Sequence, residues 1–271
     1  MQINIKKIQE AFQSEKAPLI HCITNDITSE LLANLILFSG AKPFMAYAPQ
    51  EMEEIARSCQ SLFLNTGQLT PIRAEGMKIA ANISLQEKKP VVIDCVGIGA
   101  SAFRRKTIED ILREGPDLIK GNYSEMRALC RLKTRAGGVD VAGEDKEKKS
   151  QKELSGALKK MARESGKIYL ATGEVDLVAG PDSFFLLKNG CPQLDWITGT
   201  GDIVGALSAV LMARGLDPLL SAIGAVSLLN ISAERAEGSP DLFSFRTRLL
   251  EELCQMRQDH AWTDQIRLEA L

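Results

Sequence analysis

A short glycine-rich segment near residue 200 carries the residues best suited to chemistry on an anion. In Gly199-Thr200-Gly201-Asp202, the two glycines leave the backbone free to adopt positive φ and to bring its N–H groups close to a ligand. An apolar helix is expected over residues 203–213, so its positive end faces the same place. The segment predicts an anion site for a phosphoryl group in transfer, with Asp202 as proton acceptor. The alternative is a plain glycine turn in which Asp202 caps the helix.

Two further acidic residues are expected at the ends of strands. Asp94 ends the apolar run 91–93, and Asn122-Tyr123-Ser124-Glu125 follows the next strand. Ligands of open α/β sheets bind at this carboxyl edge. Asn122 and Glu125 could therefore hold Mg²⁺ through its waters, with Asp94 as the second carboxylate. The alternative is a capping box, in which Asn122 caps a helix and Glu125 reaches back, and both interpretations can hold at once.

Several single residues have both an ordinary and a functional interpretation. Lys120 and Thr172, at strand ends, could meet nucleotide phosphates, although a lone lysine there is commonly just solvated. Asn25 is explained as a helix cap and His21 as a structural residue of a strand. Met45 is explained as core filler. None of these residues identifies a site by itself.

Several familiar motifs are absent from the sequence. Gly97 and Gly99 lack the third glycine of G-x-G-x-x-G, and Gly199, Gly201 and Gly205 place theirs one residue late. No G-x-x-x-x-G-K-[ST] occurs, because Gly166-Lys167 is followed by Ile168 and introduces a strand instead of a helix. The six cysteines form no C-x-x-C pair and the two histidines form no H-x-x-x-H pattern. Rossmann, Walker-type and thioredoxin motifs are therefore not supported, and neither are zinc hydrolysis and a Ser-His-Asp triad.

The elements that must position these residues alternate along the chain. Apolar runs bounded by Gly, Pro and Asn predict strands at residues 18–24, 43–47, 61–66, 91–95, 118–121 and 168–172. Helical patterns lie between them, so we expect a mainly parallel sheet with helices on both faces. A turn at Gly180-Pro181-Asp182-Ser183 predicts a hairpin within residues 176–187. The charged run 144–153 indicates a solvated loop and helix start, and apolar residues in 249–256 a terminal helix.

Composition places the chain among ordinary soluble proteins. Its 271 residues are 45% hydrophobic and 25% charged, with a net charge of -2. No global basic field exists to gather nucleic acid or anionic lipid. The charged amino terminus lacks a signal-peptide core, and no apolar run is long enough to span a bilayer. We therefore expect a cytoplasmic protein with one domain over residues 1–271, no nucleic-acid partner and no membrane role.

An ordered set of short segments occurs across residues 18–235. It comprises Thr24-Asn25, Ala33-Asn34, Gly40-Ala41-Lys42-Pro43-Phe44-Met45, Leu64-Asn65-Thr66-Gly67, Asp94-Cys95-Val96-Gly97-Ile98-Gly99-Ala100, Gly121-Asn122-Tyr123-Ser124-Glu125, Thr172-Gly173 and Thr198-Gly199-Thr200-Gly201-Asp202. Any one of these segments could arise by chance, but the ordered set is specific. Taken together, the segments resemble one family, the hydroxyethylthiazole kinases of thiamine salvage, in the ribokinase-like superfamily.

The resemblance implies a ribokinase-like three-layer fold and transfer of the γ-phosphate of ATP to the alcohol of 4-methyl-5-(2-hydroxyethyl)thiazole. It implies a homotrimer with substrate sites between subunits. By motif position it also implies contacts for single residues. Asn25, Met45 and Gly199 would contact the thiazole alcohol, and Lys120, Asn122 and Thr172 would contact the nucleotide. Asp94 and Glu125 would hold Mg²⁺. Gly199, Thr200 and Gly201 would supply the anion hole, and Asp202 would accept the proton.

Two positions depart from the family pattern. Asp202 stands where members usually have Cys and where other ribokinase-like kinases have Asp, so deprotonation could be stronger or the range of alcohols broader. Cys95 replaces a usual Pro, which should loosen one turn and spare Asp94. The alternatives are a kinase of another small alcohol, such as a hydroxymethylpyrimidine or a sugar, an ATP- or ADP-dependent dehydratase of hydrated nicotinamide cofactors, and a non-catalytic relative.

Overall fold

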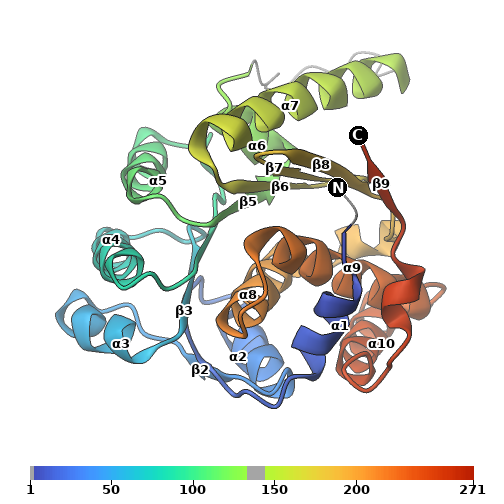
Figure 1. Ribbon diagram of the computed structural model, residues 1–271, viewed down its shortest axis with the longest axis horizontal. Helices are drawn as coiled ribbons and strands as arrows, with labels where there is room; N and C mark the ends of the chain where they lie inside the picture. Colours follow the sequence, from blue (N-terminus) through green and yellow to red (C-terminus); the bar gives the residue numbers. More distant parts are fainter. Residues whose placement is uncertain (1–2, 133–143) are drawn as a thin grey trace.

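The alternation of strands and helices produces a mostly parallel sheet that is covered on both faces. A computed structural model describes residues 3–132 and 144–271. In this part of the chain nine strands form one sheet in the order β2-β1-β3-β4-β5-β6-β7-β8-β9 (Figure 1). Pairing is parallel from β2 to β6 and antiparallel from β6 to β9. The predicted fold class is confirmed.

The predicted strands appear within one to three residues of the expected positions. They are β1 (Leu19–Ile23), β2 (Lys42–Phe44), β3 (Ser61–Asn65), β4 (Val91–Asp94), β5 (Leu118–Asn122), β6 (Ile168–Thr172), β7 (Asp176–Gly180) and β8 (Ser183–Leu187). A further strand, β9 (Leu268–Ala270), was not predicted. The expected hairpin is β7 and β8, in which Gly180 pairs with Ser183. β2 ends at Phe44, so Met45 lies in the loop after it and not in the strand as expected.

The helices form two layers (Figure 1). On one face lie α3 (Met52–Ser58), α4 (Pro71–Gln86), α5 (Ala102–Glu114), α6 (Tyr123–Leu129) and α7 (Glu144–Ser165). On the other lie α1 (Lys6–Gln13), α2 (Ser29–Phe38), α8 (Thr200–Ala213), α9 (Pro218–Ala236) and α10 (Leu242–Gln255). Short 3₁₀ turns are η1 (Pro49–Glu51), η2 (Pro192–Trp196) and η3 (Trp262–Gln265).

The charged run at residues 144–153 is helical, which confirms the expected helix start and corrects the expected loop. α7 begins at Glu144 and continues to Ser165. Acidic residues precede lysines by four positions in this run, and that spacing supports a helix. The predicted terminal helix is confirmed as α10, where Leu249 and Leu253 are buried. No helix in the described residues is both long and apolar enough to cross a membrane.

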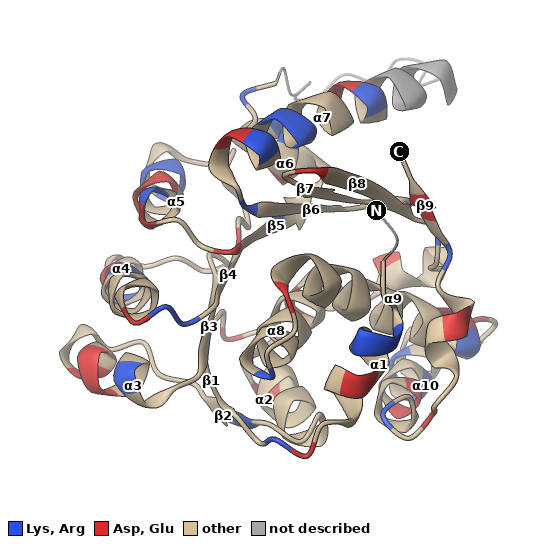
Figure 2. Ribbon diagram, viewed as in Figure 1, with Lys and Arg blue, Asp and Glu red and all other residues tan. Residues whose placement is uncertain are grey.

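The two faces of the sheet carry separate apolar cores. One contains the inner faces of α2, α8, α9 and α10, and the other contains those of α3 to α7. Figure 2 shows charged residues over the outer helices, whereas α8 is tan along most of its length. α8 is buried almost from end to end, since it packs directly on the strands. Its first turn lies at the carboxyl ends of these strands.

The sheet register brings the predicted site residues into line. Asn65 of β3 pairs with Asp94 of β4, and Asp94 pairs with Lys120 of β5. Asn122 of β5 pairs with Thr172 of β6. Parallel pairing therefore places these five side chains along one edge, although Asn65 and Thr172 are more than a hundred positions apart in the sequence.

Gly205 allows α8 to approach the sheet. A Cβ at this position would lie 2.2 Å from Cε2 of Phe63, whose side chain is fully buried in β3. We predict that Gly205→Ala lowers the free energy of unfolding by about 1–3 kcal/mol, because the ring and the helix must move apart. Urea denaturation measures this change.

Gly156→Ala is the matched control, since Gly156 of α7 has open space around its Cβ position. An alanine in a helix interior should raise stability there by about 0.5–1 kcal/mol. Equal effects of the two substitutions would contradict the close packing of α8 on Phe63.

Candidate active site

A pocket of about 430 Å³ opens where α8 begins, at the carboxyl ends of the central strands. It is lined by Asp94, Val96, Lys120, Asn122, Glu125, Thr172, Gly173, Asp176, Leu194, Asp195, Thr200, Gly201, Asp202, Val204, Val226, Leu229 and Asn230. Most residues predicted from the sequence as nucleotide, metal or anion contacts are among them. Its size lies in the range of small-molecule sites.

The glycine-rich segment forms the start of α8 as predicted. Gly199 has φ +99°, and a Cβ there would lie 2.6 Å from Cγ2 of Thr28, so both its conformation and its space require glycine. A Cβ on Gly201 would lie 3.4 Å from Nζ of Lys120 and 3.8 Å from Oδ2 of Asp94. The missing side chain at Gly201 thus leaves the helix N-terminus open toward the lysine, and this opening suits an anion.

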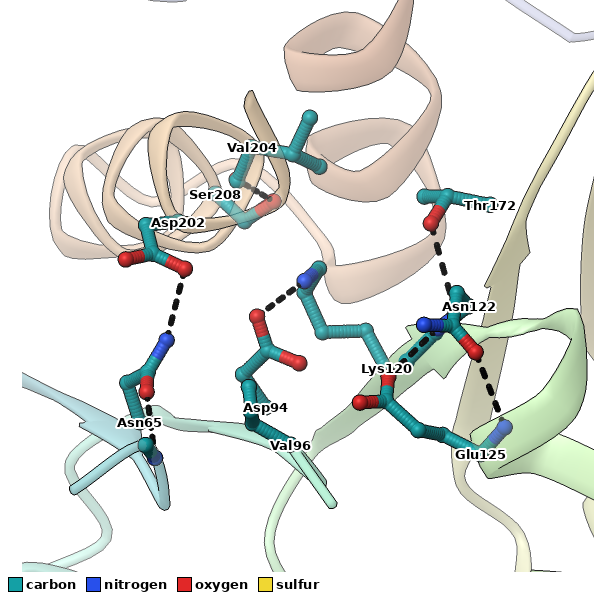
Figure 3. Close-up of polar contacts among 12 residues, drawn as sticks. Asn65, Asp94, Val96, Lys120, Asn122, Glu125, Thr172, Asp202, Val204 and Ser208 are labelled. Atoms are coloured by element: carbon teal, nitrogen blue, oxygen red, sulfur yellow. Dashed lines mark hydrogen bonds and ion pairs between the residues drawn. The ribbon is translucent and has the colours of Figure 1, made fainter. Parts of the chain in front are cut away.

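The Asp202 side chain does not cap α8, so that alternative is wrong. The helix is preceded by Gly199, with no side-chain cap. Oδ1 of Asp202 accepts a hydrogen bond from Nδ2 of Asn65 at 2.7 Å (Figure 3). Oδ2 accepts one from Nδ2 of Asn25 at 2.9 Å and one from the hydroxyl of Thr28. Three neutral donors thus stabilise a carboxylate that also lines the pocket.

Asp94 and Lys120 form an ion pair in the interior of the site (Figure 3). Both side chains are almost completely buried. Burial raises the pKa of Asp94 to about 6; the charge of Lys120 opposes this rise, and those of Glu125 and Asp202 add to it. The three carboxylates outnumber the one ammonium group, so the charge of the site favours a further cation.

Asn122 and Glu125 form the capping box that the sequence analysis gave as an alternative. Oδ1 of Asn122 accepts a hydrogen bond from the Glu125 N–H at 2.9 Å, and Oε2 of Glu125 accepts one from the Asn122 N–H at 2.8 Å (Figure 3). Oε1 of Glu125 accepts from the Gly97 N–H at 2.9 Å. These bonds orient the Glu125 carboxylate beside the pocket.

The donor set fits Mg²⁺ held together with phosphates. In the part of the chain that the structure describes, no three His, Cys, Asp or Glu residues form a metal cage. Mg²⁺ usually takes one or two carboxylates and completes its shell with water and phosphate oxygens. Asp94 and Glu125 line the same pocket and supply that number.

The other end of the pocket combines an apolar wall with a buried polar pair. Leu194, Val204, Val226 and Leu229 contribute the apolar side chains. At this end Asp176 accepts hydrogen bonds from the Gly173 N–H at 3.0 Å and from Nδ2 of Asn230 at 2.7 Å. Asp176 and Asn230 were not predicted, because neither belongs to a spacing pattern.

The three expected substrate residues, Asn25, Met45 and Gly199, are not among the residues that line this pocket. Asn25 is buried against Asp202, and its Oδ1 accepts from the Thr28 N–H at 3.1 Å. The N-cap of α2 is Thr28, without a side-chain cap bond, so the expected capping role of Asn25 is wrong. Met45 packs partly buried against the core on the α8 face. Its loop is held by His21, whose Nε2 lies 2.9 Å from the Ala46 carbonyl oxygen. Burial lowers the pKa of His21 to about 4, so the ring is neutral and structural, as expected.

Cys95 does not loosen its turn, contrary to expectation. The Cys95 N–H donates to the Lys120 carbonyl at 2.8 Å, and the Cys95 carbonyl accepts from the Ile98 N–H at 3.1 Å. A proline at this position has no N–H to donate. The cysteine therefore adds a hydrogen bond between the β4 turn and β5, next to Asp94.

Comparison with known structures first identifies the class of fold. Pyridoxal kinase from Staphylococcus aureus, solved with pyridoxal, superposes with a TM-score of 0.65 at 14% identity, over 94% of this chain and 99% of that one. This likeness assigns the fold to the ribokinase-like α/β class.

Three further findings identify the family. The model of the hydroxyethylthiazole kinase family matches residues 10–259. Hydroxyethylthiazole kinase 2 of Streptococcus pneumoniae is 39% identical over 98% of this chain and 99% of its own. A hydroxyethylthiazole kinase structure from Pyrococcus horikoshii OT3 has a TM-score of 0.85 at 32% identity and covers 98% of this chain and 99% of that one. The chain belongs to the hydroxyethylthiazole kinase family.

The buried carboxyl of Asp176 should make stability depend on pH. Burial raises its pKa to about 7, whereas in the unfolded chain it ionises near pH 4. Between these pH values the folded state binds the extra proton, so stability falls as pH rises through this window. We predict that Asp176→Asn, which cannot ionise, gains at least about 3 °C in Tm relative to wild type on going from pH 5 to pH 8.

Thermal unfolding of both proteins at the two pH values measures this gain. Any fixed cost of losing an acceptor for Asn230 is the same at both, so the change in the Tm difference isolates the titration. An unchanged Tm difference would show that Asp176 is already ionised in the folded protein at pH 5.

Proposed function

We propose that the chain phosphorylates the primary alcohol of 4-methyl-5-(2-hydroxyethyl)thiazole, with ATP as donor and Mg²⁺ as cofactor, in thiamine salvage. The observation that carries the proposal is the buried Asp202 carboxylate beside the open N-terminus of α8. This arrangement offers a proton acceptor and an anion cradle side by side, as an in-line phosphoryl transfer to an alcohol requires.

The cradle stabilises the transferring group mainly by position. The N–H groups of Gly199, Thr200 and Gly201 receive the charge of the γ-phosphoryl, and Lys120 faces the same point from β5. Asp94 and Glu125 hold Mg²⁺, which when bound neutralises charge on the phosphates. Asp202 takes the proton of the alcohol as the new bond to phosphorus forms.

The remaining predicted contacts divide between donor and acceptor sides. Asn122 and Thr172 line the pocket on the nucleotide side, next to its apolar end, which suits a purine ring. Met45 contacts the thiazole from the loop after β2. Asn25 lies between the nucleotide side and the thiazole side, because its amide donates a hydrogen bond to Asp202.

We also propose that the protein is a homotrimer with its substrate sites completed between subunits. Large apolar side chains are exposed close in sequence to Asn25 and Met45, namely Ile27 at 67%, Phe44 at 38% and Tyr47 at 43%, and Phe38 at the end of α2 is 51% exposed. An apolar patch of this kind beside a site marks an interface, and a second copy would close the thiazole side. The six free cysteines fit a reducing cytoplasm.

A coupled assay of ADP release tests the activity directly. With ATP, Mg²⁺ and the thiazole alcohol we expect turnover, with at least tenfold less for hydroxymethylpyrimidine. Asp202→Asn should lower kcat by about 10²–10⁴ with little change in KM for ATP, because the amide cannot accept the proton.

Asp182→Asn, in the hairpin turn distant from the site, is the matched control and should retain wild-type kcat. Near-normal turnover by the Asp202 variant would remove this residue from the mechanism. Turnover of another alcohol in preference to the thiazole would reject the proposed substrate but retain the kinase.

Sedimentation velocity tests the oligomer. We expect a species of three 29.6 kDa chains at micromolar concentration. Phe38→Glu places a charge on the exposed apolar face of α2 and should produce monomers with at least tenfold higher KM for the thiazole. A wild-type monomer with full activity would contradict both the trimer and the shared site.

A further inference from the structure

The contacts around Asp202 distinguish its two carboxylate oxygens. We propose that Asn25, Thr28 and Asn65, here called the clamp, orient Asp202 so that Oδ1 takes the alcohol's proton, and that Asn65 is the main positioning residue. The inference rests on the proposed kinase activity and assigns a role to side chains that are not themselves expected to react.

The number of hydrogen bonds that each Asp202 oxygen accepts shows which oxygen can accept the proton. A carboxylate oxygen offers about two acceptor directions. Oδ2 of Asp202 receives Nδ2 of Asn25 at 2.9 Å and the hydroxyl of Thr28, so both directions are used. Oδ1 receives only Nδ2 of Asn65, at 2.7 Å. One acceptor direction therefore remains, and it is on Oδ1.

The Asn65 amide can face Asp202 in only one way. Its Oδ1 accepts from the Gly67 N–H at 2.7 Å and from Nδ2 of Asn25 at 3.5 Å. Reversing the amide would set its carbonyl against the Asp202 carboxylate and its NH₂ against two donors. Asn65 is also fully buried at the end of β3. The orientation of Nδ2 is thus fixed from both sides (Figure 3).

The two loops that carry the clamp are tied to each other. The Asp26 N–H donates to Oε1 of Gln68 at 2.8 Å, and Arg73 pairs with Asp26 and donates to the Gln68 carbonyl at 3.2 Å. Gln68 has φ 47°, a conformation that non-glycine residues rarely adopt. These contacts hold the loops after β1 and β3 around Asp202, so the clamp is built before substrate arrives.

The chemical step needs this orientation. The alcohol oxygen forms a bond to the γ-phosphorus while the bond from phosphorus to the β,γ-bridging oxygen breaks, and that electron pair leaves with ADP. The alcohol proton moves to Oδ1 of Asp202 and is later released to water. A carboxylate that rotates away from the alcohol slows this step without weakening substrate binding, and small misplacements can cost about 10²-fold.

Asn65→Leu tests the positioning role, because leucine has a similar shape and no donor. We expect kcat for the thiazole alcohol to fall by about 10–10²-fold, with KM for ATP and for the alcohol within twofold of wild type. A difluorinated ethanol side chain gives a more acidic hydroxyl that depends less on a base. The loss with this analogue should therefore be at least threefold smaller.

Ser61→Ala is the matched control. Ser61 is buried on the same strand and donates to the Ala209 carbonyl of α8, away from the pocket, so its loss should leave kcat unchanged. Should Asn65→Leu fail to fold, Thr28→Val and Thr28→Ser decide: the valine variant lacks the hydroxyl and should lose kcat, whereas the serine variant retains it.

A loss confined to KM, an equal loss with both alcohols, or equal kcat for the two Thr28 variants would overturn the proposal. Failure of the proposed function is distinct, because it would appear as absence of turnover in the wild-type protein itself. If the wild type prefers another alcohol, the same variants are measured with that alcohol and its more acidic analogue, and the same outcomes apply.

Discussion

The first turn of α8 must lie over the carboxyl ends of β3, β4 and β5, and the rest of the site depends on this placement. An apolar helix that is buried along its length can approach the sheet only where its residues are small, as Gly205 is against Phe63. That contact fixes where Gly199 and Gly201 expose the backbone. Parallel register then supplies Asp94 and Lys120 opposite the helix end. Packing of the apolar core thereby determines the geometry of a polar site.

Burial also sets the electrostatics of the site. Three carboxylates and one lysine share a region with little water, and the raised pKa of Asp94 reflects that cost. In the proposed reaction, Mg²⁺ would supply positive charge beside the carboxylates, and the phosphates would give Lys120 and the helix end an anion. The clamp contributes differently, since its neutral donors stabilise the Asp202 carboxylate without adding charge.

Residues at strand ends were predictable from the sequence, and residues known only from long-range contacts were not. Alternating apolar runs indicated the parallel sheet, and Asp94, Lys120, Glu125 and Asp202 follow because ligands bind at its carboxyl edge. No function was assigned to Asn65 from the sequence, because an amide at a strand end belongs to no recognisable motif spacing. Its hydrogen-bond partner, Asp202, is 137 positions away in the sequence. At residues 144–153 the expected helix start was right and the expected loop was wrong, because charge density was weighed above helical spacing. The order of the motifs identified the family.

The most direct test of the central claim is a crystal structure of the protein with ADP, Mg²⁺, aluminium fluoride and the thiazole alcohol. The arrangement of α8 predicts the fluoride group within hydrogen-bond distance of the backbone N–H groups of residues 199–201, with the alcohol oxygen beside Oδ1 of Asp202. A fluoride group bound elsewhere in the pocket, or an alcohol oxygen beyond hydrogen-bond reach of Asp202, would contradict the assignment of this helix end as the site of phosphoryl transfer.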